Sequence, residues 1–94
     1  MILCIAGDPG GSRCVSPVAL ALLRMGEHVV VADHGFLAKE WPAEHSACVQ
    51  TLEVVTEALP RCKALIFGSS THDTCPLALA RQAKYLGIPV IHVL

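Results

Sequence analysis

Hydrophobic and polar positions along the chain form two patterns: short continuous apolar runs, and longer stretches with apolar residues three and four apart. The continuous runs are typical of strands that are buried on both faces of a parallel sheet. We expect four such strands, at residues 2–6, 29–32, 64–67 and 90–93. The stretches with helical spacing predict helices at residues 13–25, 46–59 and from 74 or 76 to 86. Residues 34–45 have no clear period, and we expect a loop with one helical turn there.

Turn and capping residues predict where these helices begin and end. Gly26 and Gly87 follow the first and last helical stretches, where glycine commonly ends a helix. Ser46 is the expected N-cap of the middle helix. Pro17 predicts that the first helix begins near Ser12, because first-turn N–H groups have no intrahelical acceptor to lose.

The order of the predicted elements indicates one α/β domain. The chain has 94 residues, of which 53% are hydrophobic and only 4% aromatic, so the core must consist of aliphatic side chains. Strands that alternate with helices favour a parallel sheet with right-handed crossovers. We expect a small four-stranded parallel sheet of order 2-1-3-4, in a Rossmann-like or flavodoxin-like three-layer sandwich.

Two polar loops are expected at the carboxyl edge of this sheet, after the first and third strands, where ligands bind in open α/β folds. They read "GDPGGS" (7–12) and "GSSTHD" (68–73), and each precedes a helix N-terminus, which attracts anions. The residues expected to bind a ligand there are Gly10, Gly11, Ser12, Ser69, Ser70 and Thr71. The structural alternative is that Ser12 and Ser70 cap helices, that Asp73 completes a capping box with Ser70, and that the glycines only turn the chain.

Three residues of these loops are candidates for catalysis: Asp8, His72 and Asp73. A carboxylate at Asp8 would repel a phosphate, so Asp8 either accepts from a sugar hydroxyl, holds a metal with Asp73, or serves the turn. His72, and His34 after the second strand, lie at the same expected edge, where a histidine can act as base or donor.

Other motifs point away from several classes of protein. "GDPGG" is neither the dinucleotide fingerprint nor a P-loop, and the histidines share no ligand spacing, so we expect no cofactor and no metal. Cys75 and Arg81 have the spacing of thiol phosphatases, but the residues between them form a helix rather than a glycine-rich cradle. The five cysteines include no C-x-x-C pair, which favours free thiols in a reducing compartment.

Charge and hydropathy predict a soluble, cytoplasmic protein with a small-molecule ligand. Seven Lys and Arg oppose eight Asp and Glu for a net charge of -1, and the basic residues are scattered, so we expect no nucleic-acid partner. No apolar run approaches the roughly 18 residues of a membrane span, so we expect no membrane contact. The last strand, "VIHVL", has an unpaired apolar edge. We expect this strand, or the adjacent helix face through Leu79, Ala83 and Leu86, to meet a second copy or a separate catalytic subunit.

The stretch "AGDPGGSRCVSPVALALLRMGEHVVVADHG" (6–35) resembles the opening of the amino-terminal Rossmann-like domain of GT-B glycosyltransferases and sugar-nucleotide 2-epimerases. "LIFGSSTHDTCPLALARQAKYLGIPVIHVL" (65–94) is similar to a later part of that domain. Since those enzymes bind the donor nucleotide mainly on a carboxyl-terminal domain, the resemblance implies half of a nucleotide-sugar or phosphorylated-ligand site, which a partner completes. In that half-site Gly10, Gly11, Ser12, Ser70 and Thr71 would contact the acceptor or the donor phosphates.

Two alternatives use the same residues. "THDTCPLALARQAKYLGIPVIHV" (71–93) also resembles nucleoside 2-deoxyribosyltransferases, although residues 75–78 lack the Glu expected on their helix. A non-catalytic interaction module or phosphocarrier is the other alternative. Carriers of this kind place a Cys or His directly after the first strand, where this chain has Asp8.

Overall fold

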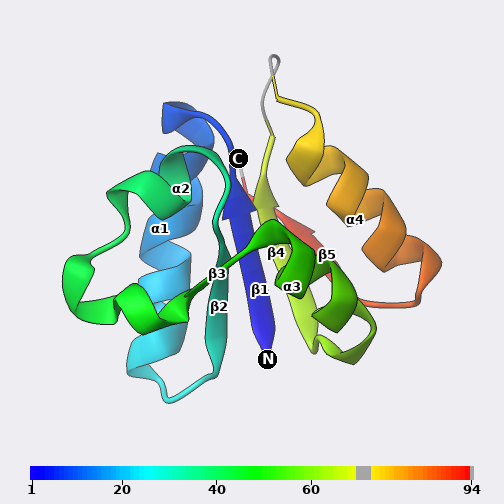
Figure 1. The fold of residues 1–94 in the computed structure, drawn as a ribbon, viewed down its shortest axis with the longest axis horizontal. Helices are drawn as coiled ribbons and strands as arrows, with labels where there is room; N and C mark the ends of the chain where they lie inside the picture. Colours follow the sequence, from blue (N-terminus) through cyan, green and yellow to red (C-terminus); the bar gives the residue numbers. More distant parts are fainter. Residues whose placement is uncertain (70–72, 94) are drawn as a thin grey trace.

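Five parallel strands form the sheet at the centre of the protein, in the order β3-β2-β1-β4-β5 (Figure 1). The computed structural model describes residues 1–69 and 73–93. The strands are β1 (Ile2–Ala6), β2 (Val29–Ala32), β3 (Val49–Gln50), β4 (Ala64–Gly68) and β5 (Val90–His92). The predicted α/β class with a parallel sheet is confirmed. The predicted count of four strands is wrong, and the full order differs from the prediction, because β3 adds a fifth strand outside β2. The four strands that were predicted keep their predicted relative order, as β2-β1-β4-β5.

Helices cover both faces of this sheet (Figure 1). They are α1 (Pro9–Arg24), α2 (Gly35–Glu40), α3 (Leu52–Ala58) and α4 (Cys75–Tyr85), with short 3-10 helices η1 (Ala43–Cys48) and η2 (Leu59–Arg61). Side chains of α1 and α2 pack on one face, and those of α3 and α4 pack on the other. Within the described ranges, no helix is long and apolar enough to span a membrane.

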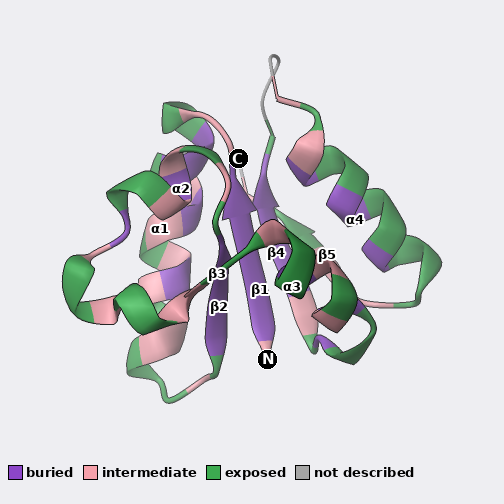
Figure 2. Cartoon of the chain, in the orientation of Figure 1, coloured by how far each residue is buried: buried purple, intermediate pink, exposed green. Residues whose placement is uncertain are grey.

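Strand β1 lies at the centre of the core, between β2 and β4, and all five of its residues are buried (Figure 2). Its side chains alternate between the two faces, as the pleat requires. Leu3 and Ile5 join the cluster under α3 and α4, whereas Ile2 and Cys4 join the cluster under α1 and α2. This two-sided burial explains why the run is apolar at every position.

Helix α1 begins earlier than predicted, at Pro9 rather than near Ser12. Asp8 is the N-cap, and its Oδ1 accepts a hydrogen bond from the Gly11 N–H at 2.8 Å. Pro9 suits the first helical position, where its missing N–H costs nothing. Pro17 therefore lies inside the helix and removes the bond that an N–H there would donate to the Arg13 carbonyl.

The middle of the chain also differs from the prediction of one helix capped by Ser46. Val49 and Gln50 pair with Val31 and Ala32 and so give the outer edge of β2 a backbone partner. Helix α3 begins only after Thr51, whose hydroxyl accepts from the Val54 N–H at 3.3 Å. Strand pairing of residues 49–50 therefore delays the start of the helix.

The stretch predicted as a loop with one helical turn, residues 34–45, holds helix α2 and the start of η1. Trp41 anchors the connection between them. The residue is only 8% exposed, and its Nε1 donates to the His45 carbonyl at 2.9 Å.

Candidate functional site

Strands β1, β2 and β4 end at the same edge of the sheet, and the backbone segments that follow them lie in close contact there. Gly35 has a φ of +72°, and a Cβ at this position would lie 2.5 Å from the Cα of Gly7. A Cβ at Gly68 would lie 2.7 Å from the Cα of Gly11. Glycine at these places lets the first turns of α1 and α2 approach the strand ends, which brings three polar segments together.

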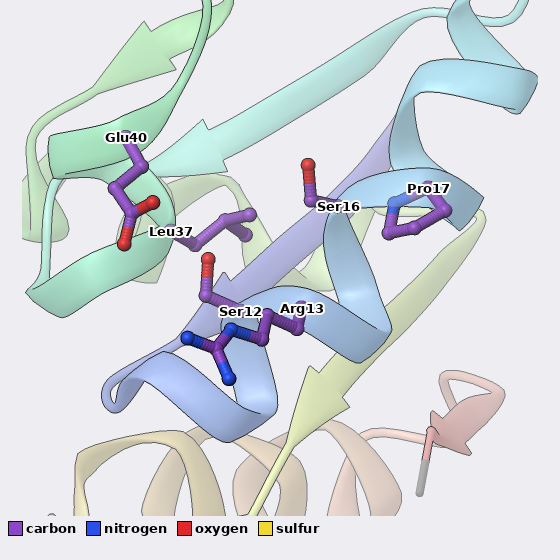
Figure 3. A pocket seen from close by; sticks show the side chains of 6 residues that line it. All are labelled: Ser12, Arg13, Ser16, Pro17, Leu37 and Glu40. Carbon is purple, nitrogen blue, oxygen red and sulfur yellow. The ribbon is translucent and has the colours of Figure 1, made fainter.

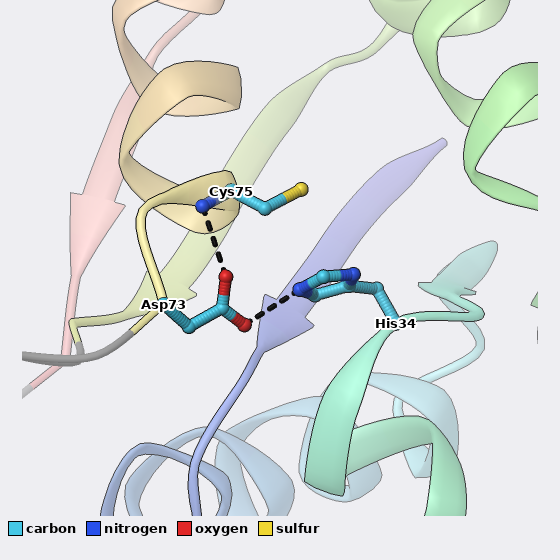
Figure 4. Close-up of polar contacts among 3 residues, drawn as sticks. All are labelled: His34, Asp73 and Cys75. Carbon is cyan, nitrogen blue, oxygen red and sulfur yellow. Dashed lines mark hydrogen bonds and ion pairs between the residues drawn. The ribbon is translucent and has the colours of Figure 1, made fainter.

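His34 and Asp73 form a polar pair across this edge, from segments 39 positions apart (Figure 4). The distance from His34 Nε2 to Asp73 Oδ2 is 2.6 Å, and the side chains are 28% and 25% exposed. The second carboxylate oxygen, Oδ1, accepts from the N–H of Cys75, the first residue of α4, at 3.0 Å. Asp73 is therefore held through both oxygens, and it holds the imidazole in turn.

Asp73 lies directly over Gly7, and any side chain at Gly7 would collide with its carboxylate. The glycine after β1 is thus a requirement of the pair. A histidine oriented by a carboxylate is an arrangement that can accept a proton from a hydroxyl group at its other ring nitrogen.

The predicted ligand-binding residues occupy two different places. Gly10, Gly11 and Ser69 line one open groove of about 340 Å³ together with Asp8, Cys14 and Val93. Ser12 lines a separate pocket between α1 and α2. Ser70, Thr71 and His72 lie outside the described residues.

Asp8 already places a negative charge at the N-terminus of α1. Its carboxylate accepts from Gly11, and its carbonyl accepts from the Ser12 N–H at 2.9 Å. The six groove residues include no Lys or Arg to offset this charge. In residues 1–69 and 73–93, no three His, Cys, Asp or Glu side chains gather to hold a metal ion.

The cysteine thiols near the core are poor nucleophiles. Burial, and secondarily the Asp73 carboxylate, raises the pKa of Cys75, which keeps this thiol protonated near neutral pH. Burial also raises the pKa of Cys62, and it raises that of Cys4 to about 12. These shifts agree with the sequence-based argument against a thiol phosphatase.

The contact of His34 with Asp73 was not predicted from the sequence, although both residues were considered as catalytic groups. The contact could have been predicted from the positions of the two residues in the sequence. His34 comes two residues after β2, and Asp73 is at the end of the loop after β4. Both strands neighbour β1 in the sheet.

Comparisons with protein-family models, with curated proteins and with solved structures found no match to this chain. The geometry of the site is therefore the basis for inferring function.

Proposed function

We propose that the domain binds a hydroxyl-bearing ligand of the nucleotide-sugar or phosphorylated-sugar type at the carboxyl edge of the sheet, and that His34 takes a proton from one of its hydroxyls. The observation that carries the proposal is the 2.6 Å contact between His34 Nε2 and Asp73 Oδ2. The class that fits is a Rossmann-like half-site of a glycosyltransferase or epimerase.

The pair suits general base catalysis for a specific reason. With Nε2–H donating to Asp73, the lone pair of the imidazole is on Nδ1, which lies on the opposite side of the ring (Figure 4). A ligand hydroxyl that donates to Nδ1 gives its proton to that nitrogen as its oxygen attacks the anomeric carbon of a nucleotide sugar. The bond from that carbon to the nucleoside diphosphate breaks, and the diphosphate leaves with the electron pair. The Asp73 carboxylate then stabilises the imidazolium that forms.

The groove along the start of α1, whose lining does not include His34 or Asp73, favours sugar hydroxyls over a bare phosphate. Asp8 and Ser69 offer oxygen acceptors, and the lining contains no cation to neutralise a phosphate. The anionic part of a nucleotide sugar would then bind a second unit, which fits the half-site that the resemblance implies.

Exposed apolar side chains on α4 and β5 provide a surface for that second unit, either another copy or a separate subunit or domain. Tyr85 is 90% exposed, Ile91 49% and Leu77 41%. The helix face predicted for this contact is wrong in part, because Leu79 and Ala83 are buried in the core, whereas Leu86 is 40% exposed. We expect sedimentation at micromolar concentration to show a species heavier than 10.0 kDa. A single 10.0 kDa species that unfolds cooperatively would contradict the assembly.

The binding proposal is tested by NMR titration of the labelled chain with UDP-glucose, with glucose and with UDP. We expect both glucose-bearing ligands to shift the amides of residues 7–11, 34–35 and 73–75, and UDP, whose only sugar is ribose, to leave them unchanged. A shift that UDP alone reproduces, or the absence of any shift there, would contradict the proposal. A 2′-deoxyribonucleoside in the same titration tests the nucleoside-transfer alternative.

Variants at the two ends of β2 give the matched comparison. His34→Gln removes the imidazole beside Asp73, whereas His28→Gln removes an exposed imidazole just before the same strand. If His34 holds the ligand hydroxyl, His34→Gln weakens glucose binding about two- to tenfold, the usual effect of one lost hydrogen bond. His28→Gln should bind as the wild type does, and equal losses in both would count against the role of His34.

A further inference from the structure

A second pocket lies between α1 and α2 (Figure 3). Its volume is about 220 Å³, and its lining consists of Ser12, Arg13, Ser16, Pro17, Leu37 and Glu40. None of these residues lines the groove at the carboxyl edge. Ser12 and Ser16 are one turn apart on one face of α1, whereas Gly10 and Cys14 present the neighbouring face to the groove. The helix therefore separates two cavities.

Ser12 is the feature that marks this pocket as a binding site. It is the buried polar residue of the described core, only 5% exposed, and it lines the pocket with its hydroxyl on the side of α2 (Figure 3). Its Oγ makes no hydrogen bond to any described residue, and its backbone N–H is already used by the Asp8 carbonyl. No side-chain oxygen or nitrogen of the described residues is both buried and without a hydrogen-bond partner, so this hydroxyl is accessible from the pocket, where water or a ligand can hydrogen-bond to it.

We propose that this pocket binds a small neutral polyhydroxyl compound, such as one sugar ring or a cyclitol, through the hydroxyl of Ser12. The rim carries one cation and one anion, Arg13 and Glu40, which do not form an ion pair with each other in the described structure. A guanidinium donates hydrogen bonds and a carboxylate accepts them, so a hydroxyl group, which does both, can bind either. The opposite charges offset each other, which favours a ligand without net charge.

The remaining walls fit a ring with one apolar face. The exposed ring of Pro17 supplies most of the carbon surface, since Leu37 is only 1% exposed, while Ser12 and Ser16 supply hydroxyls beside it. Sites for drug-sized ligands usually span about 300–1,000 Å³. A pocket of about 220 Å³ therefore suits a single ring rather than a nucleotide.

NMR titration with D-glucose, D-mannose and myo-inositol tests the inference, with D-glucuronate and D-glucosamine as charged comparators. We expect at least one neutral probe to shift the amides of Ser12, Ser16 and Leu37 saturably. We expect the charged comparators to bind more weakly than the best neutral probe. No saturable shift with any neutral probe, or tighter binding of a charged comparator, would overturn the proposal.

Ser12→Ala and Ser69→Ala separate this site from the groove. Since the Ser12 hydroxyl has no described partner in the free protein, its loss should leave folding intact and weaken the neutral probe about two- to tenfold at the Ser12 pocket. Ser69→Ala removes a hydroxyl from the groove and should leave that affinity unchanged. Unchanged affinity in Ser12→Ala would refute the anchoring role. Binding in this pocket shifts the amides of Ser12, Ser16 and Leu37, whereas binding at the carboxyl edge shifts those of residues 7–11, 34–35 and 73–75. The absence of binding in this pocket is therefore distinguishable from the absence of binding at the edge.

Discussion

Gly35→Ala is the substitution that most directly tests how the carboxyl edge is built. Gly35 begins α2 with a φ of +72°, and the Phe36 N–H after it donates to the Gly7 carbonyl at 3.1 Å. A Cβ at Gly35 would lie 2.5 Å from the Gly7 Cα and 2.6 Å from the Gly7 oxygen. Both neighbours are backbone atoms, so α2 must move away from β1 to relieve the collision.

Two costs add at this position. An L-residue in the left-handed region costs about 1–2 kcal/mol. Forcing a group into packed backbone costs about 1–3 kcal/mol more. We therefore expect Gly35→Ala to lower the free energy of unfolding by about 2–5 kcal/mol.

Gly26→Ala is the matched control, because Gly26 has a φ of +86° but no atom within 4 Å of its added Cβ. It carries the conformational cost alone, about 1–2 kcal/mol, reduced by the lower entropy of the unfolded chain. Urea denaturation of the wild type and both variants measures the difference. Equal losses in Gly35→Ala and Gly26→Ala would refute the steric argument and the close approach of α2 to β1.

Three further outcomes follow from the structure. Thr51→Ala removes the N-cap of α3 and should lower the free energy of unfolding by about 0.5–2 kcal/mol, whereas Ser46→Ala should lower it by less than about 0.5 kcal/mol. Urea unfolding measures both values, and a larger loss in Ser46→Ala would contradict the observed start of α3. Because burial raises the pKa of Cys4 from 9.0 to about 12, the folded state keeps a proton that the unfolded chain releases, and stability falls as pH rises from 9.0 toward 12. Between about pH 9 and 11 the wild type should lose about 2 kcal/mol more than Cys4→Ala, and parallel pH profiles would contradict this. Thiol labelling of the native protein near neutral pH should be slow at Cys75, whose pKa is raised by burial and by Asp73, and rapid selective labelling there would revive thiol chemistry.

The sequence alone determined the strands that form the core. Strands β1, β2 and β4 are apolar at consecutive positions because both faces of each are covered, and this burial leaves a signal within the segment itself. The ends of the first and last helices were also predictable from local sequence, because Gly26 and Gly87 adopt positive φ angles of +86° and +78°, which favour glycine. The convergence of the loops after β1 and β4 follows from the parallel order of these strands.

Tertiary structure decided the features that depend on a partner distant in the chain. β3 has only two residues, too few for a pattern, and it exists because β2 presents an open edge. The pairing of His34 with Asp73 needs β1 between their strands and a glycine at position 7 to leave room for the carboxylate. Ser12 was expected to bind the same ligand as Gly10 and Gly11. Because α1 begins at Pro9, Ser12 is already the fourth residue of the helix, and its side chain lies on the face toward α2. A side chain's direction depends on where its helix begins, and here the Asp8 cap set that beginning.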